Sequence, residues 1–181
     1  FSFLDQYNFT IYENDPLENA VGIDPEMLGH IFENLLEENK EKGAFYTPKE
    51  IVHYMCQESI IEFLCTQLDH LPKHDITQLV RNNTVTSIIG KRENALSINE
   101  KLKNIKICDP AIGSGAFPMG ILLELFECRQ LLYGYLKTNE EFNPAKIKKE
   151  IIQKNIYGVD IENGAVDIAR LRFWLSLVVD E

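Results

Sequence analysis

Apolar residues recur at helical spacing along much of the chain, and short apolar runs separate some of these stripes. Near the beginning, residues 7–12 alternate apolar with polar side chains, which predicts a short strand. Asp24-Pro25 then has the pattern of an N-cap followed by the first helical residue. The stripe behind it ends in the charged run 37–42, which predicts a packing helix with a solvated end. We interpret residues 1–42 as a leader with one strand and one helix.

A second helix is predicted to begin at Thr47-Pro48-Lys49-Glu50. Thr followed three residues later by Glu is the pattern of a capping box, and Pro suits the first helical turn. The apolar stripe of this helix continues to about Leu68. Residues 43–181, which include it, are interpreted as the N-terminal part of one cofactor-binding domain.

Residues 69–98 have the weakest pattern, because Pro, Asn and Gly interrupt it. Only short elements are predicted there, at 76–80 and 85–89, followed by a short helix at 98–104. His70 and His74 have the spacing of metal ligands on a helix, but Pro72 lies between them. We therefore interpret both histidines as surface residues.

The second half of the chain predicts a regular series of elements. Ile105 and Ile107 form a short β-branched strand of the buried parallel type. A helix of about 17 residues follows from Ala116, with Gly134 as its stop. Asn143 is the predicted N-cap of the next helix, and residues 156–160 form a second strand.

The last helix carries an apolar stripe and the only tryptophan of the chain, Trp174, which we place in the core. The residues predicted on its buried side are Ala165, Ile168, Ala169, Leu171, Leu175 and Val178. The order strand–helix–helix–strand–helix is typical of the opening of a doubly wound α/β sheet. Asp109 and Asp160 end its two strands, and ligands of such sheets bind at the carboxyl ends of the strands.

Composition narrows the class of protein. The 181 residues suffice for one core, and 28 acidic against 18 basic residues give a net charge of −10, which argues against a main nucleic-acid-gripping surface. No apolar run approaches the roughly 18 residues that a membrane span needs. The four cysteines lack metal-ligand spacing and have apolar neighbours, which indicates mostly buried, reduced thiols in a cytoplasmic protein. Without a signal peptide or an initiator Met at Phe1, we expect a segment of a longer protein.

The turn after the first strand is the strongest candidate for a ligand site. Gly113 and Gly115 fit the start of a dinucleotide-binding pattern, but Pro118 takes the third glycine position. The carboxylate of Asp109 at the mouth of the turn would repel a pyrophosphate and attract an ammonium group. A P-loop is excluded because the turn lacks Gly-Lys-Ser/Thr.

S-adenosylmethionine has the parts that such a site would recognise, and it carries no phosphate. Asp109 would face its ammonium region, and Asp160 would accept hydrogen bonds from the ribose hydroxyls. Ile161 and Phe117 are apolar residues that would cover an adenine ring. Before the second helix, Phe45 and Tyr46 add flat surfaces to a loop that Gly43 lets bend.

With these residues laid out, the chain resembles adenine-N6 DNA methyltransferases, and more narrowly the methylase region of type IIG restriction-modification enzymes and of related phage-defence methylases. Three blocks carry the resemblance in the order that the class shows: Gly43 to Pro48, Asp109 to Phe117, and Gly158 to Glu162 with the helix behind it. Phe9-Thr10 and Pro25 to Gly29 also resemble the family's leader.

The resemblance implies a Rossmann-like fold that binds S-adenosyl-L-methionine, here in a truncated form behind a helical leader. The residues implied in cofactor binding are Phe45, Tyr46, Thr47, Asp109, Ala111, Gly113, Gly115, Phe117, Asp160 and Ile161. It also implies duplex DNA as the partner of the full-length protein, bound through parts outside this segment, and a restriction or specificity subunit or domain.

The family's catalytic motif, Asn/Asp-Pro-Pro-Tyr/Phe, does not occur in the 181 residues. That motif holds the flipped adenine of the target. Asn143-Pro144 is the nearest string, but it precedes the second strand and lacks the second Pro and the aromatic residue. We therefore expect an inactive segment of an active enzyme. A catalytically inactive scaffold or specificity module, and a methyltransferase of RNA or protein, remain alternatives.

Overall fold

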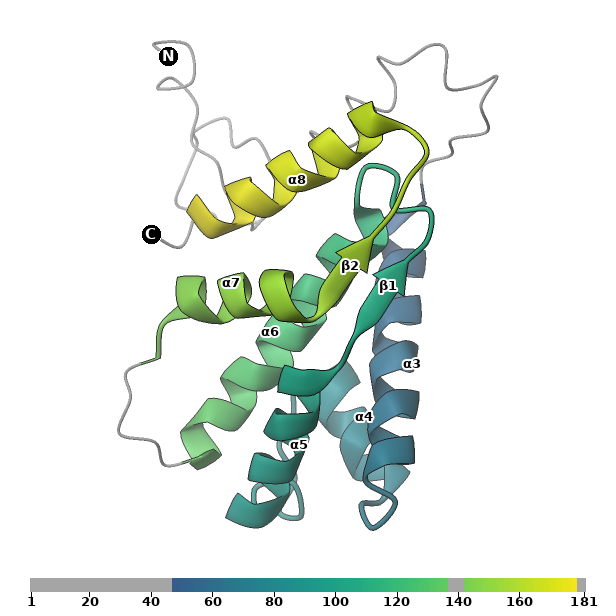
Figure 1. The fold of residues 1–181 in the computed structure, drawn as a ribbon. Helices are drawn as coiled ribbons and strands as arrows, with labels where there is room; N and C mark the ends of the chain where they lie inside the picture. The colour runs from purple at the N-terminus through teal and green to yellow at the C-terminus, as the bar shows by residue number, and fades with distance from the viewer. Residues whose placement is uncertain (1–46, 137–141, 179–181) are drawn as a thin grey trace, which may run out of the picture.

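The computed structural model describes residues 47–136 and 142–178 of the chain (Figure 1). Within these residues the chain forms six helices and two short parallel strands. They are α3 (Lys49–Gln67), α4 (Lys73–Asn82), α5 (Arg92–Asn104), β1 (Ile107–Asp109), α6 (Ala116–Leu136), α7 (Pro144–Lys154), β2 (Ile156–Gly158) and α8 (Asn163–Val178). The predicted strand at 7–12, the predicted helix behind Asp24-Pro25, and the loop residues Phe45 and Tyr46 lie outside the described residues.

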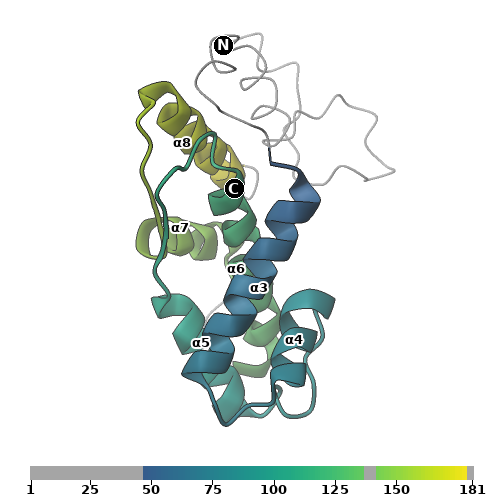
Figure 2. The same cartoon turned by 90° about the vertical axis from the view of Figure 1, so that its right-hand side faces the viewer.

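Helix α6 is the centre of the packing and contacts α3, α4, α5, α7 and α8 (Figures 1 and 2). Its side chains Leu122, Leu125 and Leu132 are fully buried, and burial of each such side chain contributes roughly 1.5–3 kcal/mol. Gly120 lets α3 come close, because a Cβ there would lie 2.7 Å from Val52 Cγ1. The stop predicted at Gly134 is wrong: burial of Leu136 extends α6 past it and offsets a cost of roughly 1 kcal/mol for a helical Gly.

The two strands pair in parallel, with Ile107 opposite Ile156 and Asp109 opposite Gly158. Ile156 is buried and Ile107 half-buried, whereas Cys108 and Tyr157, which point to the other face, are exposed. The predicted order strand–helix–helix–strand–helix is confirmed by β1, α6, α7, β2 and α8. The described part is mostly helical around this small sheet, and the wider Rossmann-like architecture stays a prediction.

The capping box predicted at Thr47 and Glu50 is wrong. Helix α3 begins at Lys49, one residue later than a Thr47 cap requires, and Pro48 occupies the N-cap position without a side-chain cap. The carbonyl of Pro48 accepts hydrogen bonds from the N–H groups of Ile51 and Val52, at 3.0 and 3.1 Å. Extended backbone at Pro48, with ψ 141°, is what moves the helix start past Thr47.

The region 69–98 is more regular than predicted. Pro72, interpreted as a break, is the N-cap residue of α4, and Asn83 ends that helix in the left-handed conformation with φ 49°. Helix α5 starts at Arg92, well before the predicted residue 98. The predicted surface positions of His70 and His74 are confirmed, since both are exposed.

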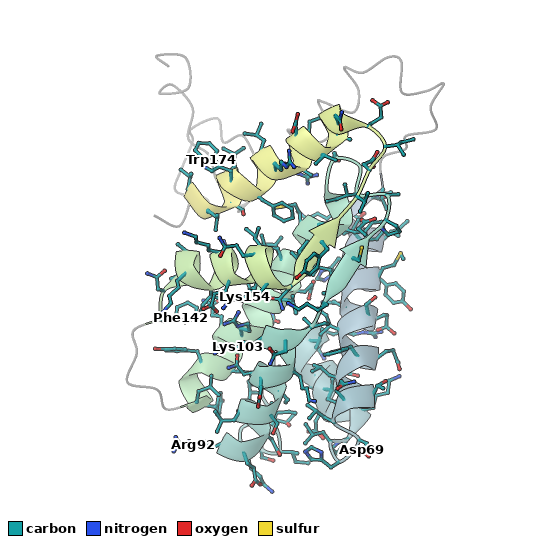
Figure 3. The ribbon with its side chains drawn as sticks, viewed as in Figure 1. Asp69, Arg92, Lys103, Phe142, Lys154 and Trp174 are labelled. Atoms are coloured by element: carbon teal, nitrogen blue, oxygen red, sulfur yellow. The ribbon has the colours of Figure 1, made fainter. Side chains whose placement is uncertain are left out.

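Helix α8 buries Ala169 and Leu175 as predicted, but Leu171 and Val178 are exposed. The core position predicted for Trp174 is also wrong: the side chain is 59% exposed and lies on the side of α8 that faces away from α7 (Figure 3). Tryptophan is the largest apolar side chain, so its type alone favoured burial, but the orientation of α8 decides. None of the described helices is long and apolar enough to span a membrane.

Candidate cofactor-binding site at the carboxyl ends of the strands

The turn between β1 and α6 depends on two glycines with positive φ. Gly113 has φ +53° and Gly115 has φ +88°, a region that residues with a Cβ rarely adopt. A Cβ at Gly115 would also lie 3.0 Å from the Cβ of Ala169 on α8, so this glycine lets the turn and α8 pack closely. A Cβ at Gly113 would meet no heavy atom of the described residues within 4 Å, so none of them fills the space beside Gly113.

Asp160 joins the two loops at the carboxyl ends of the strands. One oxygen of its carboxylate, Oδ2, accepts a hydrogen bond of 2.8 Å from the N–H of Gly113, 47 residues away in the sequence. The other, Oδ1, accepts a bond of 2.9 Å from the N–H of Glu162. The hydrogen bonds from the backbone N–H groups of Glu162 and Gly113 lower the pKa of Asp160 below its ordinary value. Asp160 is therefore an oriented, ionised carboxylate at neutral pH.

The backbones of the same two loops are also bonded to each other. Val159 donates its N–H to the carbonyl of Asp109, and Ile112 donates to the carbonyl of Val159, both at 3.0 Å. Gly158 makes this approach possible, because a Cβ there would lie 2.2 Å from Ile112 Cδ1. The arrangement continues the parallel pairing past the end of β2 and holds the turn in one position.

Asp109 lies at the base of the turn and is half-buried. Its Oδ1 accepts a hydrogen bond of 3.0 Å from the N–H of Ala111, which closes a local turn. The structure thus brings five of the predicted residues together: Asp109 at the end of β1, Ala111, Gly113 and Gly115 in the turn behind it, and Asp160 in the loop after β2.

The other predicted residues lie in different surroundings. Ile161 is 99% exposed, so its side chain has no packing partner among the described residues. Phe117 is half-buried and packs against the hydrophobic core. Thr47 is the first described residue, before the start of α3. Their predicted contacts with a cofactor stay predictions.

Sequence reasoning missed Arg172, which connects α8 to the glycine turn. This side chain is 5% exposed, and its Nη1 donates to the carbonyl of Ser114 at 2.9 Å and to Ser114 Oγ at 3.4 Å. The signal was present in the spacing, because Arg172 lies three residues after Ala169 and three before Leu175, both buried. A charged residue in an apolar helical stripe indicates a polar partner in the core.

The two carboxylates, Asp109 and Asp160, give this end of the sheet negative charge and hydrogen-bond acceptors. Among the described residues, no group of three or more His, Cys, Asp or Glu is placed to hold a metal ion. Comparison of the chain with known families finds a match to the DNA-methyltransferase domain of MmeI over residues 52–179.

The chain belongs to this DNA-methyltransferase domain family. Two relatives agree with the match. A putative type II restriction enzyme and methyltransferase of Methanocaldococcus jannaschii is 34% identical over 189 residues, which cover 98% of this chain and 16% of the relative. A type II restriction enzyme and methyltransferase of Escherichia coli is 26% identical over 191 residues, which cover 97% of this chain and 16% of the relative.

The chain therefore spans about one sixth of the length of either of these relatives, at 16%. No solved structure matches it. Family membership confirms the resemblance to the methyltransferase region of restriction-modification enzymes. The matched segment begins within α3 and continues past residue 178, the end of α8, so it contains β1, β2 and the glycine turn between β1 and α6.

Proposed function

We propose that this methyltransferase domain binds S-adenosyl-L-methionine at the carboxyl ends of β1 and β2, as part of an adenine-N6 DNA methyltransferase of a restriction-modification system. The observation that carries the proposal is the Asp160 carboxylate, held by the N–H groups of Gly113 and Glu162 beside the glycine turn. A carboxylate has about four lone-pair positions, and the two backbone bonds leave further ones for the hydroxyls of a ribose.

The proposed partner of the ammonium group of the same ligand is the carboxylate of Asp109. Its Oδ1 accepts the local bond from Ala111, and its second oxygen makes no hydrogen bond with a described residue. The space beside Gly113 supports close approach of a ligand to the backbone, because no side chain of the described residues lies within 4 Å of a Cβ placed there. Asp109, Ala111, Gly113 and Gly115 would thus hold the amino-acid part of the cofactor.

The proposed contact of the adenine ring is the side chain of Ile161. An apolar side chain that is 99% exposed, directly after the proposed ribose-binding residue, gains hydrophobic stabilisation if a flat ring covers it. Phe117 from the start of α6, and Phe45, Tyr46 and Thr47 before α3, complete the proposed binding set. When bound, the cofactor would supply the methyl group, while this chain would bind and orient it.

The proposed acceptor is the adenine amino group in duplex DNA, reached by base flipping. The two relatives are described as type II restriction enzymes and methyltransferases, which supports duplex DNA as the substrate and a restriction or specificity part as a partner of the full-length protein. All four cysteines are free thiols, and this supports a reducing compartment, the cytoplasm.

Calorimetry with two ligands tests the cofactor site. S-adenosyl-L-methionine carries both the ammonium and the ribose, whereas methylthioadenosine has the ribose and adenine alone. We expect Asp160→Asn to weaken the binding of both ligands by about 10- to 100-fold, which corresponds to the loss of a hydrogen bond to a charged group. Asp109→Asn should weaken S-adenosyl-L-methionine by about five-fold and leave methylthioadenosine unchanged, because only the first carries an ammonium.

Asp167→Asn is the matched control, since Asp167 is an exposed carboxylate on α8 that pairs with Arg170. It should bind both ligands like the unmodified chain. If neither ligand releases heat at millimolar concentration, or if Asp160→Asn binds both as well as Asp167→Asn does, the cofactor proposal is refuted. Transfer of a radiolabelled methyl group to adenine in duplex DNA by the full-length protein tests the proposed reaction separately.

A further inference from the structure

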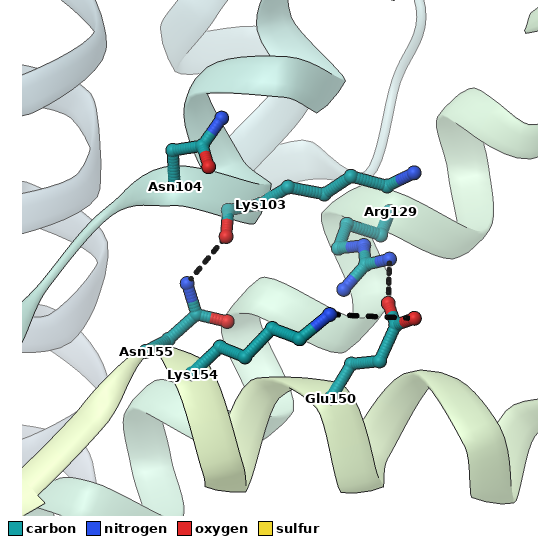
Figure 4. Close-up of a pocket in the computed structure, with 6 residues that line it drawn as sticks. All are labelled: Lys103, Asn104, Arg129, Glu150, Lys154 and Asn155. Carbon is teal, nitrogen blue, oxygen red and sulfur yellow. Dashed lines mark hydrogen bonds and ion pairs between the residues drawn. The ribbon is translucent and has the colours of Figure 1, made fainter.

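A polar pocket lies at the opposite ends of the strands, where α5 leads into β1 and α7 leads into β2 (Figure 4). It has a volume of about 190 Å³ and is lined by Lys103, Asn104, Arg129, Glu150, Lys154 and Asn155. None of these six side chains is apolar. The pocket is therefore built for a polar ligand and offers no surface on which a nucleobase would stack.

Three cations and one carboxylate line this pocket, in a chain with a net charge of −10. Arg129 Nη2 donates to Glu150 Oε2 at 3.1 Å, and Lys154 Nζ lies 4.0 Å from Glu150 Oε1. Burial by itself would raise the pKa of Glu150, but the hydrogen bond and charge of Arg129, followed by the charges of Lys154 and Lys103, outweigh it and lower the pKa. Positive potential thus exceeds what the single carboxylate neutralises.

Arg129 has donor capacity that the described residues leave unused. The residue is 5% exposed, and its guanidinium makes one hydrogen bond within the described part of the chain, to Glu150. Its Nε is buried without a partner among the described residues. A buried guanidinium normally has most of its donors satisfied, so this one is prepared for a further acceptor.

Lys103 adds a cation that contacts the pocket carboxylate only at longer range, through its charge. Its ammonium group makes no hydrogen bond or ion pair with any described residue, and Figure 4 shows it extended across the pocket toward Arg129. The pocket wall behind it is rigid, because the side chain of Asn155 donates to the backbone carbonyl of Lys103 at 3.0 Å. The cationic groups are therefore presented by fixed backbone on α5, α6 and α7.

We propose that this pocket binds a phosphate group through Lys103, Arg129 and Lys154. Planar guanidinium and two ammonium groups around one space suit a tetrahedral oxyanion. A water molecule takes about 30 Å³ in the liquid, so the pocket has room for one phosphate group and several waters. The source is either free phosphate or the phosphodiester backbone of duplex DNA, and both present the same oxygens. The site is separate from the glycine turn, which lies at the other ends of the same strands.

Nuclear magnetic resonance of the full chain tests the proposal, with inorganic phosphate as the probe at constant ionic strength. We expect saturable shifts of the Arg129 Nε–H and of the side-chain amides of Asn104 and Asn155. Lys103→Gln should weaken phosphate binding by about two- to five-fold, the value of one partly exposed ion pair. Because the ammonium group of Lys103 makes no hydrogen bond or ion pair with a described residue, we expect its replacement to leave the fold intact, and circular dichroism checks this.

Lys149→Gln is the control, since Lys149 is an exposed lysine on α7 that does not line the pocket. A non-saturable response to phosphate, or equal weakening by Lys149→Gln and Lys103→Gln, would overturn the proposal and leave only non-specific attraction. A second arm adds a short DNA duplex to the phosphate-bound protein. Displacement of phosphate that depends on Lys103 assigns the site to the DNA backbone, and retention of phosphate assigns it to the free ion.

Discussion

Asn155 and Asp160 stand on either side of β2 and hold the two ends of the sheet by opposite chemistry. At the amino end, the Asn155 side-chain amide donates to three backbone carbonyls, at 3.3, 3.0 and 2.8 Å, those of Leu102, Lys103 and Ile105. At the carboxyl end, the Asp160 carboxylate accepts from the N–H groups of Gly113 and Glu162. Asn155 thus holds its end of the sheet as a hydrogen-bond donor, and Asp160 holds the other end as an acceptor.

The difference follows from the direction of the helices at each end. The amino end of β1 follows the C-terminus of α5, where the last carbonyls of the helix have no partner in the helix. The carboxyl end leads through the glycine turn to the N-terminus of α6, where N–H groups are free. A side chain that clamps the first end must donate, and one that clamps the second must accept.

The charges on the two ends follow the same division. Carboxylates, Asp109 and Asp160, lie at the carboxyl end, whereas Lys103, Arg129 and Lys154 line the pocket at the amino end. Backbone N–H groups favour negative charge near a helix start, and backbone carbonyls favour positive charge near a helix end. The sheet is therefore acidic where we propose the cofactor and basic where we propose a phosphate group.

Asn155→Asp should have the largest effect, because it replaces the donor of the amino end by an acceptor of the same shape. A carboxylate facing three carbonyls leaves them unpaired, and we expect a loss of about 3 kcal/mol of unfolding free energy. Asn143→Asp is the control: Asn143 Oδ1 caps α7 by accepting from the N–H of Lys146, and Asp caps equally well. Urea unfolding in which both variants lose the same amount would break the comparison.

Gly158→Ala tests the close approach of the two loops at the carboxyl end. The new methyl group would meet Ile112 Cδ1, and we expect a loss of about 2 kcal/mol from overpacking. Ile112→Val removes that Cδ1, so the double variant should lose less than the sum of the two single variants in urea unfolding. Additive losses would show that the two side chains do not meet.

Asp160→Asn should cost about 1 kcal/mol at pH 7, less than Asn155→Asp, because Asp160 is partly exposed and the amide oxygen still accepts one bond. The pKa of Asp160 is lowered in the folded chain, so its contribution to stability is full above its unfolded pKa of about 4 and is lost as pH falls through the lowered value. As the pH is lowered from 7, the unfolding free energies of Asp160→Asn and of the unmodified chain should therefore converge. A constant difference at all pH values would contradict this role.

Lys103→Gln should have the smallest effect on stability, less than about 0.5 kcal/mol, since only an exposed charge in the last turn of α5 is lost. Urea midpoints of the variant and the unmodified chain compare the two directly. A loss near that of Asn155→Asp would mean that the Lys103 side chain, and not only its backbone carbonyl, holds the amino end.

Prediction from the sequence succeeded where a pattern is local. Asn143 is an N-cap because Asn before Pro is a helix start in almost any surroundings, and the structure confirms it. The Thr47 cap was wrong although a capping box is also a local pattern. The extended backbone at Pro48 makes α3 begin one residue later than such a cap requires. Region 69–98 was underestimated because Pro72 ends one pattern and begins another.

Contacts between distant residues were not predictable in this way. Trp174 and Arg172 are two positions apart on α8, and residue type favours burial of the first, yet the structure buries Arg172 and exposes Trp174. The orientation of α8 is set by its packing on α6 and α7, and the closeness of Ala169 to Gly115 is part of that packing. Hydrophobicity along one helix does not contain this information.

The sequence by itself determined the order of elements, the two glycines that permit the turn, and the presence of an acid at the end of each strand. Only the tertiary structure decided that Asp160 bonds to Gly113, 47 residues away, and that Asn155 bonds to carbonyls about as distant on the other side. Both bonds depend on the parallel register of Ile107 with Ile156. That register is set by the packing of α6 and α7, the helices that connect the two strands in the sequence. A shift by one residue would turn the buried Ile156 toward solvent.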